Sequence, residues 1–496
     1  MIHPKEVFSD ALTVAVKGLY DSLSAADVSH SVTYCDPAFG EFSSNLAFRL
    51  AKSESKSPQE IAESVLLALR KQKAIAEASF VQPGFINVRL ENSVWLDYLS
   101  SIKDSFATSK LGKNQKIQLE FISANPTGPL VLTNAWQGYY GDILANIYSS
   151  QGYEVSREYF LNDGGNQVDS LGKAIQQALG KEFDEKTAEN LYRGEYINQT
   201  AQAIVTEIGS EKQVLSENPS MIGKKAADFI LEEYIKPDLV RLGVNYDSIF
   251  SETKLDIEKT LASLESSGLI KKKDGAIWLD GAKAELNQDE VLIRSYDNQP
   301  TYFVKDIAYQ LERLEERGFD QTITIVGPDH HGQAIRLLNT LKVLGHSGFE
   351  EISTQTIRLI KDGKEFKMSK RKGNYILLAD FLDMVPTEAA RFYFAMRDTN
   401  THMDFDIDLV KEHSSKNPVY YSLYAYARAC SIESNAKQQA IATADEFRNY
   451  EFSKTEQRLV VEISKIPLIL QEIISTRKVH QLLHQTFEVA KALDRK

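Results

Sequence analysis

Residues 117–142, IQLEFISANPTGPLVLTNAWQGYYGD, decide the fold that the rest of the chain is expected to adopt. Residues 117–122 form a short apolar run typical of a buried strand, and residues 136–149 have the pattern of a helix. Between them, Pro, Gly and Asn favour a tight turn. A strand, such a turn and a helix N-terminus together form an anion site, because unpaired backbone N–H groups point outward there.

The alternation of strands and helices continues on both sides of a long insertion. Residues 154–160 are expected to form a strand, and the segment LNDGGNQV that follows opens another helix. Residues 181–290 are expected to be mostly polar helices, and the alternation resumes at residues 301–385. Repeated strand–helix units are the mark of a parallel sheet, so we predict a Rossmann-type domain over residues 111–385.

Two further domains are predicted beside this one. Residues 1–110 mix helical and extended patterns and are expected to form an α+β domain. It includes a helix with Ser57 as its N-cap and Pro58 as its first residue, and a strand opened by a Pro-Gly pair. Residues 386–496 are almost entirely helical in pattern. The predicted fold class is therefore multidomain α/β.

The composition excludes several classes of protein. The 496 residues are 43% hydrophobic and 25% charged, which is ordinary for a soluble globular chain. Two cysteines, Cys35 and Cys430, are too few for a disulfide framework or a cysteine-rich zinc site. No cationic and apolar leader opens the chain, and no stretch reaches the ~18 apolar residues that a membrane span needs. We therefore expect a cytoplasmic protein without a membrane partner.

The net charge of −12 is unevenly distributed. Residues 401–496 carry 13 basic and 13 acidic side chains, so the acidic balance lies entirely in residues 1–400. A neutral C-terminal part is compatible with a surface that meets a polyanion. A neutral helical domain without such a partner explains the count equally well.

The segment FKMSKRKG, residues 366–373, carries several cations on a short loop late in the predicted sheet. Lys367, Lys370 and Arg371 surround Ser369, and cations on a mobile loop can close over the charge that develops on a departing pyrophosphate. A solvated basic turn is the alternative. The position after the last strand–helix unit favours phosphate binding, because ligands bind at the carboxyl ends of such strands.

These segments resemble the class I aminoacyl-tRNA synthetases, whose second signature is matched by KMSKR. The flanking segments narrow the resemblance to the arginyl-tRNA synthetase family. They are EFISANPTGPL, GYEVSREYFLNDGGNQV, TYFVKDIAYQLERL, VGPDHHGQ and HMDFDIDLVKEHSSKNPVYYSLYAYAR. The N-terminal domain is similar to the family's tRNA-contacting domain. Residues 386–496 are similar to its helical anticodon-binding domain, which is expected to be incomplete here because its helical pattern runs to the end of the chain without a stop signal.

The resemblance implies an arginine–tRNA ligase that uses ATP with Mg²⁺ and has L-arginine and tRNA(Arg) as its partners. It also implies a monomer without a DNA partner. Two alternatives remain open. One is a tRNA- or arginine-binding relative with weak or no ligase activity, and the other is a different class I synthetase or nucleotidyltransferase on the same fold.

The resemblance implies an arginine-binding role for Glu120, Asn125, Tyr302, Asp306 and Glu252. Tyr302 and Asp306 stand four residues apart, so they face one side of a helix. Carboxylates and a phenol suit the five N–H donors of a planar guanidinium. Without the family, a surface pair at this spacing is the simpler explanation.

The residues that the resemblance assigns to ATP and to catalysis gather in the turn, at GPDHHG and in KMSKR. ATP binding is assigned to Pro126, Gly128, Thr133, Gly327, Asp329, His330, Met368 and Arg371, and catalysis to Lys367, Ser369, Lys370 and Asn134. No metal site is predicted, since the two adjacent histidines lack a further ligand at a suitable spacing.

The turn departs from the family's first signature, which carries two histidines and a glycine. Val131 stands at the first histidine, Thr133 at the glycine, Asn134 at the second histidine and Trp136 at an arginine. Asn134 retains an N–H donor for a phosphate oxygen, whereas Val131 has none. Loss of one such donor typically costs about 2.7–4 kcal/mol. We therefore expect impaired activation, and a helix that begins at about residues 134–136.

Overall fold

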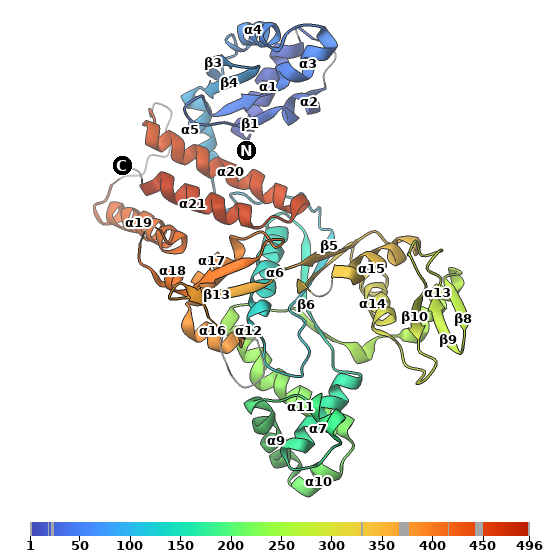
Figure 1. Cartoon of the computed structure of the whole chain (residues 1–496). Helices are drawn as coiled ribbons and strands as arrows, with labels where there is room; N and C mark the ends of the chain where they lie inside the picture. The colour runs from blue at the N-terminus through green and yellow to red at the C-terminus, as the bar shows by residue number, and fades with distance from the viewer. Residues whose placement is uncertain are drawn as a thin grey trace. The chain divides into compact units, whose positions relative to one another are not determined.

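The computed structural model describes residues 2–17, 19–20, 24–328, 331–366, 376–414, 416–441 and 450–494. The chain forms two compact units, which can be followed by colour in Figure 1. The first comprises Met1–Thr108, Tyr421–Gln471 and His484–Lys496, and the second comprises Ser109–Tyr420 and Glu472–Leu483. No described helix is both long enough and apolar enough to cross a membrane.

The N-terminal part of the first unit is an antiparallel sheet with helices, in the strand order β1-β2-β4-β3. The predicted helix is confirmed as α4: Ser57 and Glu60 cap each other's backbone N–H groups, and Pro58 is the first residue. The elements are α1 Pro4–Lys17, α2 Ala25–His30, β1 Val32–Tyr34, β2 Phe42–Ser44, α3 Leu46–Glu54, α4 Pro58–Leu69, β3 Ile75–Val81, β4 Phe85–Leu90 and α5 Asn92–Ser101.

The C-terminal part of the chain is helical, as its pattern predicted. Within the first unit, Val460 and Val461 belong to the same buried core as the N-terminal elements. The His3 ring nitrogen Nε2 lies 2.7 Å from the Ser464 carbonyl oxygen, which joins the two parts by a polar contact as well. The helices are α19 Pro418–Gln438, α20 Lys454–Thr476 and α21 His480–Asp494.

The second unit is built on a parallel sheet with the strand order β12-β11-β5-β6-β7. The order reverses between β5 and β11, so the sheet is doubly wound and the predicted Rossmann-type arrangement is confirmed. Ligands bind such sheets outside the carboxyl ends of the strands at the reversal. The strands are β5 Lys116–Phe121, β6 Glu154–Leu161, β7 Ser248–Ser251, β11 Gln321–Val326 and β12 Phe349–Ser353.

Helices connect these strands, because parallel neighbours require long crossovers. Helix α6 follows β5 and is buried over most of its surface, with Trp136, Tyr139 and Tyr148 fully buried. Helix α14 continues into a π-helical turn at Glu312–Glu316. The bounds are α6 Leu132–Ser150, α14 Tyr302–Leu311 and α15 His331–Val343.

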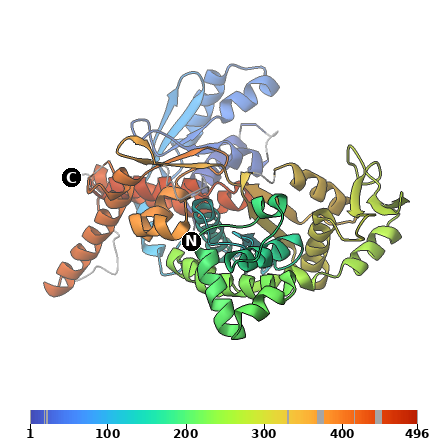
Figure 2. The same ribbon diagram turned by 60° about the horizontal axis from the view of Figure 1, so that its bottom comes forward.

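The insertion begins as a cluster of helices, which appears in green in Figures 1 and 2. Helices α7 and α11 cross at two glycines. A Cβ at Gly172 would overlap the Pro219 carbonyl oxygen, and one at Gly223 would overlap the Val168 carbonyl oxygen, so the two backbones touch directly. The helices are α7 Asn166–Ala178, α8 Glu185–Glu189, α9 Glu195–Ile208, α10 Glu211–Ser216, α11 Pro219–Ile230 and α12 Lys236–Leu242, with a π-helical turn at Leu231–Ile235.

The expectation of mostly polar helices over residues 181–290 was wrong for its second half. Residues 248–251 form β7 of the central sheet, and a separate antiparallel sheet follows in the order β10-β9-β8. Its hairpin turns at Asp274-Gly275, both with positive φ, which is a turn signal that the sequence analysis overlooked. The elements are η2 Glu252–Lys254, α13 Ile257–Ser266, β8 Ile270–Lys273, β9 Ala276–Leu279 and β10 Glu290–Ile293.

The second unit continues to Tyr420, past residue 385 where we expected the catalytic domain to end. The almost purely helical pattern expected beyond residue 386 has an exception in β15, which pairs in parallel with β13. Asp404 and Asp406 alternate with Met403 and Phe405 in this strand, and both apolar side chains are buried. The elements are β13 Ile357–Lys361, β14 Lys364–Glu365, α16 Leu378–Met384, α17 Thr387–Ala395, β15 Met403–Asp406 and α18 Ile407–Lys411.

Candidate functional site

The carboxyl ends of β5 and β11 lie side by side where the strand order reverses. The turn after β5 carries Asn125, Pro126 and Gly128, and Gly327 follows β11. A Cβ at Gly327 would lie 3.3 Å from Nε2 of Gln137 in α6. The structure thus brings together the turn after β5, the first turns of α6 and the end of β11. These are the described elements to which the resemblance assigned ATP binding.

Helix α6 begins at Leu132, earlier than the expected start at residues 134–136. The cause is Asn134, whose side-chain oxygen accepts a hydrogen bond of 2.9 Å from the Val131 N–H and so caps the helix from its first turn. Its side-chain nitrogen donates to Gln137 Oε1 at 3.3 Å. An amide nitrogen has two hydrogens, so Asn134 can serve both the helix and a ligand.

Trp136 and Val131, two of the three other altered positions, contact neighbouring segments. Trp136 is 1% exposed, and its ring centre lies 6.3 Å from that of Phe394 in α17. Val131 forms an antiparallel bridge with Leu377. The Leu132 N–H donates to the Ile376 carbonyl oxygen at 2.9 Å, which ties the start of α6 to the residues directly after position 375.

Several residues assigned from the sequence lie outside the described residues. They are Asp329 and His330 of the GPDHHG segment, and Lys367, Met368, Ser369, Lys370 and Arg371 of the KMSKR segment. Thr133, which the sequence also assigned to ATP, is the second residue of α6 and is half-buried.

A compact group at the carboxyl end of β7 consists of Glu252, Tyr302 and Lys305, and we call it the Glu252 cluster. The Glu252 side chain is 4% exposed and its Oε1 accepts a hydrogen bond from the Lys305 ammonium. Its second oxygen, Oε2, has no hydrogen-bond partner in the part of the chain that the structure describes. The Lys305 ammonium lies 5.6 Å from the centre of the Tyr302 ring, which is itself exposed.

The loop at residues 162–165 connects the Glu252 cluster with the turn after β5. Asn162 Nδ2 donates to Asn125 Oδ1 at 3.0 Å, and Asp163 accepts from the Ser251 hydroxyl at 2.6 Å, just before Glu252. Gly165 has a φ of +75° and a Cβ there would lie 3.9 Å from the Lys305 ammonium. The structure therefore brings Asn125, Glu252 and Lys305 to the border of one loop.

Asp306 lies one helical turn along α14 from Tyr302 and is half-buried. The i, i+4 spacing places both on the same side of the helix, as the sequence predicted. The structure therefore adds Asp306 to the helix face that carries Tyr302.

Glu120, to which the resemblance assigned an arginine-binding role, pairs with a cation of the protein itself. Its carboxylate accepts from Arg313 Nη1 at 3.3 Å and from the Thr324 hydroxyl at 3.0 Å, and Arg313 is fully buried. Burial raises the pKa of the Glu120 carboxyl, and the Arg313 guanidinium opposes that rise. The Glu120 side chain therefore contacts Arg313 in the π-helical turn after α14, and it also lies beside the Ser123 side chain at the start of the turn after β5.

Lys305 and Arg313 were not among the site residues predicted from the sequence. Lys305 stands between Tyr302 and Asp306 in the quoted segment, three residues from Tyr302, and this spacing was a signal for a contact with that ring. Glu120 in a strand that is otherwise mostly apolar was a signal that a buried cation must accompany it.

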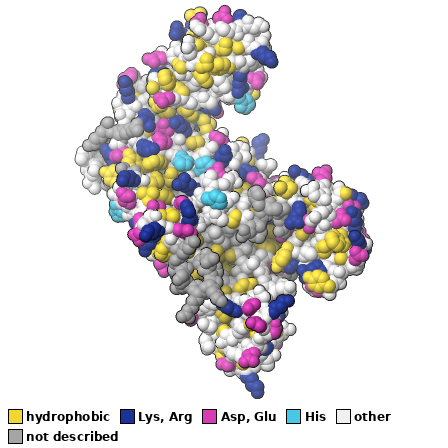
Figure 3. Space-filling view, in the orientation of Figure 1, with side chains coloured by type: hydrophobic (Ala, Val, Ile, Leu, Met, Phe, Trp, Pro, Cys, Tyr) yellow, Lys and Arg dark blue, Asp and Glu magenta, His cyan; other side chains and the backbone are white. Residues whose placement is uncertain are grey.

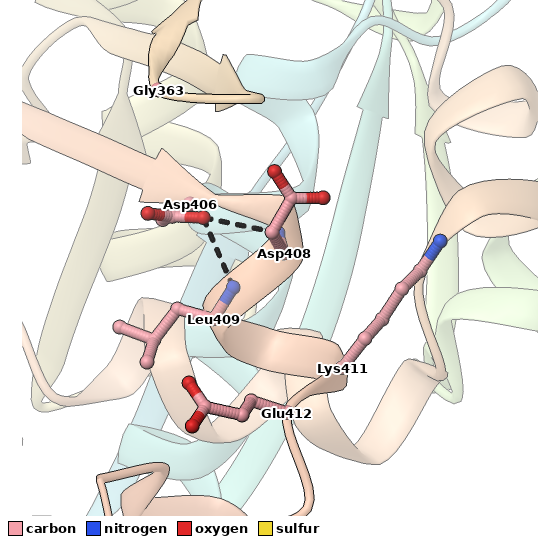
Figure 4. A pocket seen from close by; sticks show the side chains of 6 residues that line it. All are labelled: Gly363, Asp406, Asp408, Leu409, Lys411 and Glu412. Atoms are coloured by element: carbon pink, nitrogen blue, oxygen red, sulfur yellow. Dashed lines mark hydrogen bonds between the residues drawn. The ribbon is translucent and has the colours of Figure 1, made fainter.

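A shallow cavity of about 560 Å³ lies between the β13–β14 turn and α18 (Figure 4). Asp406 lines it and accepts from the Asp408 and Leu409 N–H groups at 3.0 Å each, so this carboxylate caps α18.

Among the described residues no group of three or more His, Cys, Asp or Glu side chains could hold a metal. On the face shown in Figure 3, basic and acidic side chains are interspersed.

Comparisons with known proteins agree with this architecture. Family models match in order: the arginyl tRNA synthetase N terminal domain at residues 5–90, the class I (R) tRNA synthetase catalytic domain at residues 99–406, and the DALR anticodon binding domain at residues 422–495.

Individual relatives match almost the whole chain. An arginine–tRNA ligase of Bacillus pumilus is 35% identical over 99% of this chain and 90% of that protein. One of Listeria monocytogenes is 38% identical over 93% of this chain and 85% of that protein. The arginyl-tRNA synthetase structure of Thermus thermophilus shares the fold, with a TM-score of 0.73 at 18% identity over 99% of this chain and 91% of that one. The chain belongs to the arginyl-tRNA synthetase family of class I aminoacyl-tRNA synthetases.

Proposed function

We propose that this chain is an arginine–tRNA ligase of translation. A carboxylate oxygen of L-arginine attacks the α-phosphorus of ATP, pyrophosphate leaves, and arginyl-adenylate forms. A ribose hydroxyl at the 3′ end of tRNA(Arg) then attacks the adenylate carbonyl, which forms the ester and releases AMP. Most of the rate enhancement in such a reaction comes from positioning the reactants and stabilising the developing charge.

The observation that carries the amino-acid assignment is the buried carboxylate of Glu252, whose Oε2 has no hydrogen-bond partner among the described residues. A buried carboxylate oxygen without a donor is costly, and a guanidinium can supply that donor in a bidentate geometry. Tyr302 offers an exposed ring for the guanidinium plane, and Asp306 offers a second negative charge on the same helix face. Asn125 would hold the backbone end of arginine.

The start of α6 is the proposed position of the ATP phosphates. Its backbone N–H groups and helix dipole favour an anion, and Asn134 can add a side-chain donor. Pro126, Gly128, Thr133 and Gly327 border the same place. The resemblance assigns further contacts to residues outside the described ones: Asp329, His330, Met368 and Arg371 for ATP, and Lys367, Ser369 and Lys370 for the leaving pyrophosphate.

Other parts of the proposal follow from the activity. Mg²⁺ enters only as the counter-ion that accompanies ATP, and no described residue is assigned to it. The N-terminal domain and the DALR domain would contact tRNA(Arg). The protein would act as a monomer in the cytoplasm, where translation takes place.

Charging of total tRNA with radiolabelled L-arginine by the purified chain tests this proposal. We expect ATP-dependent incorporation, and a strong loss of arginine affinity in Asp306→Asn with ATP affinity nearly unchanged, because one partner of an ion pair is removed. If the wild-type chain binds tRNA and arginine but charges nothing, the chain is a binding relative and the ligase proposal fails.

A further inference from the structure

The Lys305–Glu252 pair has a consequence for how the substrate binds. Both side chains are largely removed from solvent, with 19% of the Lys305 side chain and 4% of the Glu252 side chain exposed. Lys305 is the fourth residue of α14, in a first helical turn where the dipole disfavours a cation. Helix stability therefore does not explain its position, whereas neutralising the buried Glu252 carboxylate does.

The ammonium of Lys305 lies where a substrate cation would bind. It donates to Glu252 Oε1, it lies over the Tyr302 ring, and it lies beside Gly165. A guanidinium that paired with both oxygens of Glu252 in a bidentate geometry would need Oε1 as well as the unpartnered Oε2. Lys305 and the substrate therefore compete for the same oxygen.

The exchange is favourable for a guanidinium because the number of hydrogen bonds rises. Lys305 satisfies Oε1 alone, while a guanidinium presents parallel N–H donors to both oxygens. The flexible four-carbon stem of a lysine lets the displaced ammonium reach solvent, where it is fully hydrated.

We propose that Lys305 is an internal competitor for the guanidinium site. Its ammonium neutralises Glu252 while the site holds no substrate, and arginine binds by displacing it. This inference rests on the proposed function, because it takes Glu252 as the carboxylate that binds the arginine side chain. Lys305 is in this sense a positioning residue that sets the affinity for the substrate.

The test compares the full-length chain with its Lys305→Met variant by isothermal titration calorimetry with L-arginine. Removing the competitor should lower the dissociation constant, by about tenfold if the ion pair is formed nine-tenths of the time. The same substitution should lower the thermal stability of the free protein, because a buried carboxylate loses its partner. Saturating arginine should restore most of that stability. A role confined to protein stability would not tighten arginine binding.

Further variants serve as controls for this experiment. Lys305→Gln keeps a neutral donor for Glu252 and should give an intermediate effect if Lys305→Met folds poorly. Lys259→Met removes the lysine of a surface pair with Glu316 and should leave the arginine affinity unchanged. In a Glu252→Gln background, Lys305→Met should no longer tighten binding, which completes a double-mutant cycle.

The possible failures can be told apart. If the Lys305→Met and Lys305→Gln variants bind arginine no more tightly than the wild type does, arginine does not displace Lys305 from Glu252, and the competitor proposal is wrong. If the wild type does not bind arginine, or if Glu252→Gln alone leaves the affinity unchanged, the amino-acid assignment in the proposed function fails.

Discussion

Asn134 serves two purposes with one carboxamide. Its oxygen holds the Val131 N–H and starts α6 at Leu132, while its nitrogen contacts Gln137 and retains a second hydrogen. A histidine at this position in the family's signature is replaced by a side chain that combines a helix cap with a donor. We therefore expect Asn134 and Val131 to differ in their effect on adenylate formation, since the Val131 side chain has no hydrogen-bond donor.

The two uses of Asn134 can be separated by substitution. Asn134→Asp keeps the oxygen that caps Val131 but removes the donor, so adenylate formation should fall by about 10²–10³ with the melting temperature nearly unchanged. Asn134→Ala removes both, so the same loss of rate should come with about 1 kcal/mol of lost stability. ATP–pyrophosphate exchange in the presence of tRNA and thermal unfolding measure the two effects. An unchanged exchange rate in Asn134→Asp would show that Asn134 only caps the helix.

At the scale of elements, helix α7 depends on a close crossing with α11. Gly172→Ala places a methyl group against the Pro219 carbonyl oxygen, so the helices must separate along their length. We expect a loss of at least about 2 kcal/mol of unfolding free energy. Lys173→Ala, at a partly exposed position of the same helix, should change stability by no more than about 0.5 kcal/mol. Denaturant unfolding followed by circular dichroism measures the stability of both variants. Equal losses of stability in Gly172→Ala and Lys173→Ala would contradict the close crossing.

The central sheet carries two acidic residues and a threonine in one row across three strands. Glu120 of β5 is opposite Thr324 of β11, which is opposite Glu351 of β12. Burial, with the nearby Glu120 charge, raises the pKa of the Glu351 carboxyl from 4.5 to about 7. The folded protein therefore holds this proton more tightly than the unfolded chain does.

The sign of the resulting pH dependence follows from that difference. Below pH 4.5, Glu351 is protonated in both the folded and the unfolded state, and its contribution to the free energy of unfolding is largest. As the pH rises from 4.5 toward 7 this contribution is lost, because the unfolded chain releases its proton at a lower pH than the folded protein does. Glu351→Gln should therefore be more stable than the wild type at pH 8, by about 1–2 kcal/mol after allowance for partial solvation. At pH 4 the two should be alike. Urea unfolding at both pH values measures this, and a difference that does not depend on pH would exclude the titration of Glu351 as its cause.

At the scale of the whole molecule, the second unit is assembled from two distant stretches of chain. Residues 472–483, which comprise the end of α20 and the start of α21, belong to it, and Arg477 lies in this segment. The Arg477 guanidinium donates to Glu350 Oε2 from Nε and Nη2 at 3.0 and 2.8 Å, and its carbonyl oxygen accepts from the Tyr140 hydroxyl at 2.7 Å. Tyr140 lies on α6, so this segment contacts the same helix that begins at the proposed ATP site.

Arg477→Met should weaken this assembly. The Arg477 side chain is 16% exposed and Glu350 is 35% exposed, so the Glu350 carboxylate that loses its partner is partly hydrated, and the free energy of unfolding should fall by about 1–2 kcal/mol. Lys478→Met, at the adjacent exposed position, should have no measurable effect. Chemical unfolding gives the difference, and hydrogen exchange at residues 472–483 should rise in Arg477→Met only.

The sequence alone determined the family, the parallel sheet and most helix positions, because these depend on local periodicity and on ordered motifs along the chain. The Ser57 cap predicted α4 closely, and the alternation after residue 115 predicted the doubly wound sheet. It did not reveal β7–β10, since strands of four residues carry too few side chains for a period to be recognised.

Only the tertiary structure decided which charged groups face each other. Glu120 and Glu252 are both acidic residues near strand ends, yet one pairs with Arg313 inside the protein and the other retains an unpartnered oxygen beside Lys305. The distance along the chain between Glu120 and Arg313, or between Glu252 and Lys305, carries no local signal of contact. Burial explains these pairings, because a carboxylate that is removed from water is stabilised by a cation that the fold places within hydrogen-bond distance.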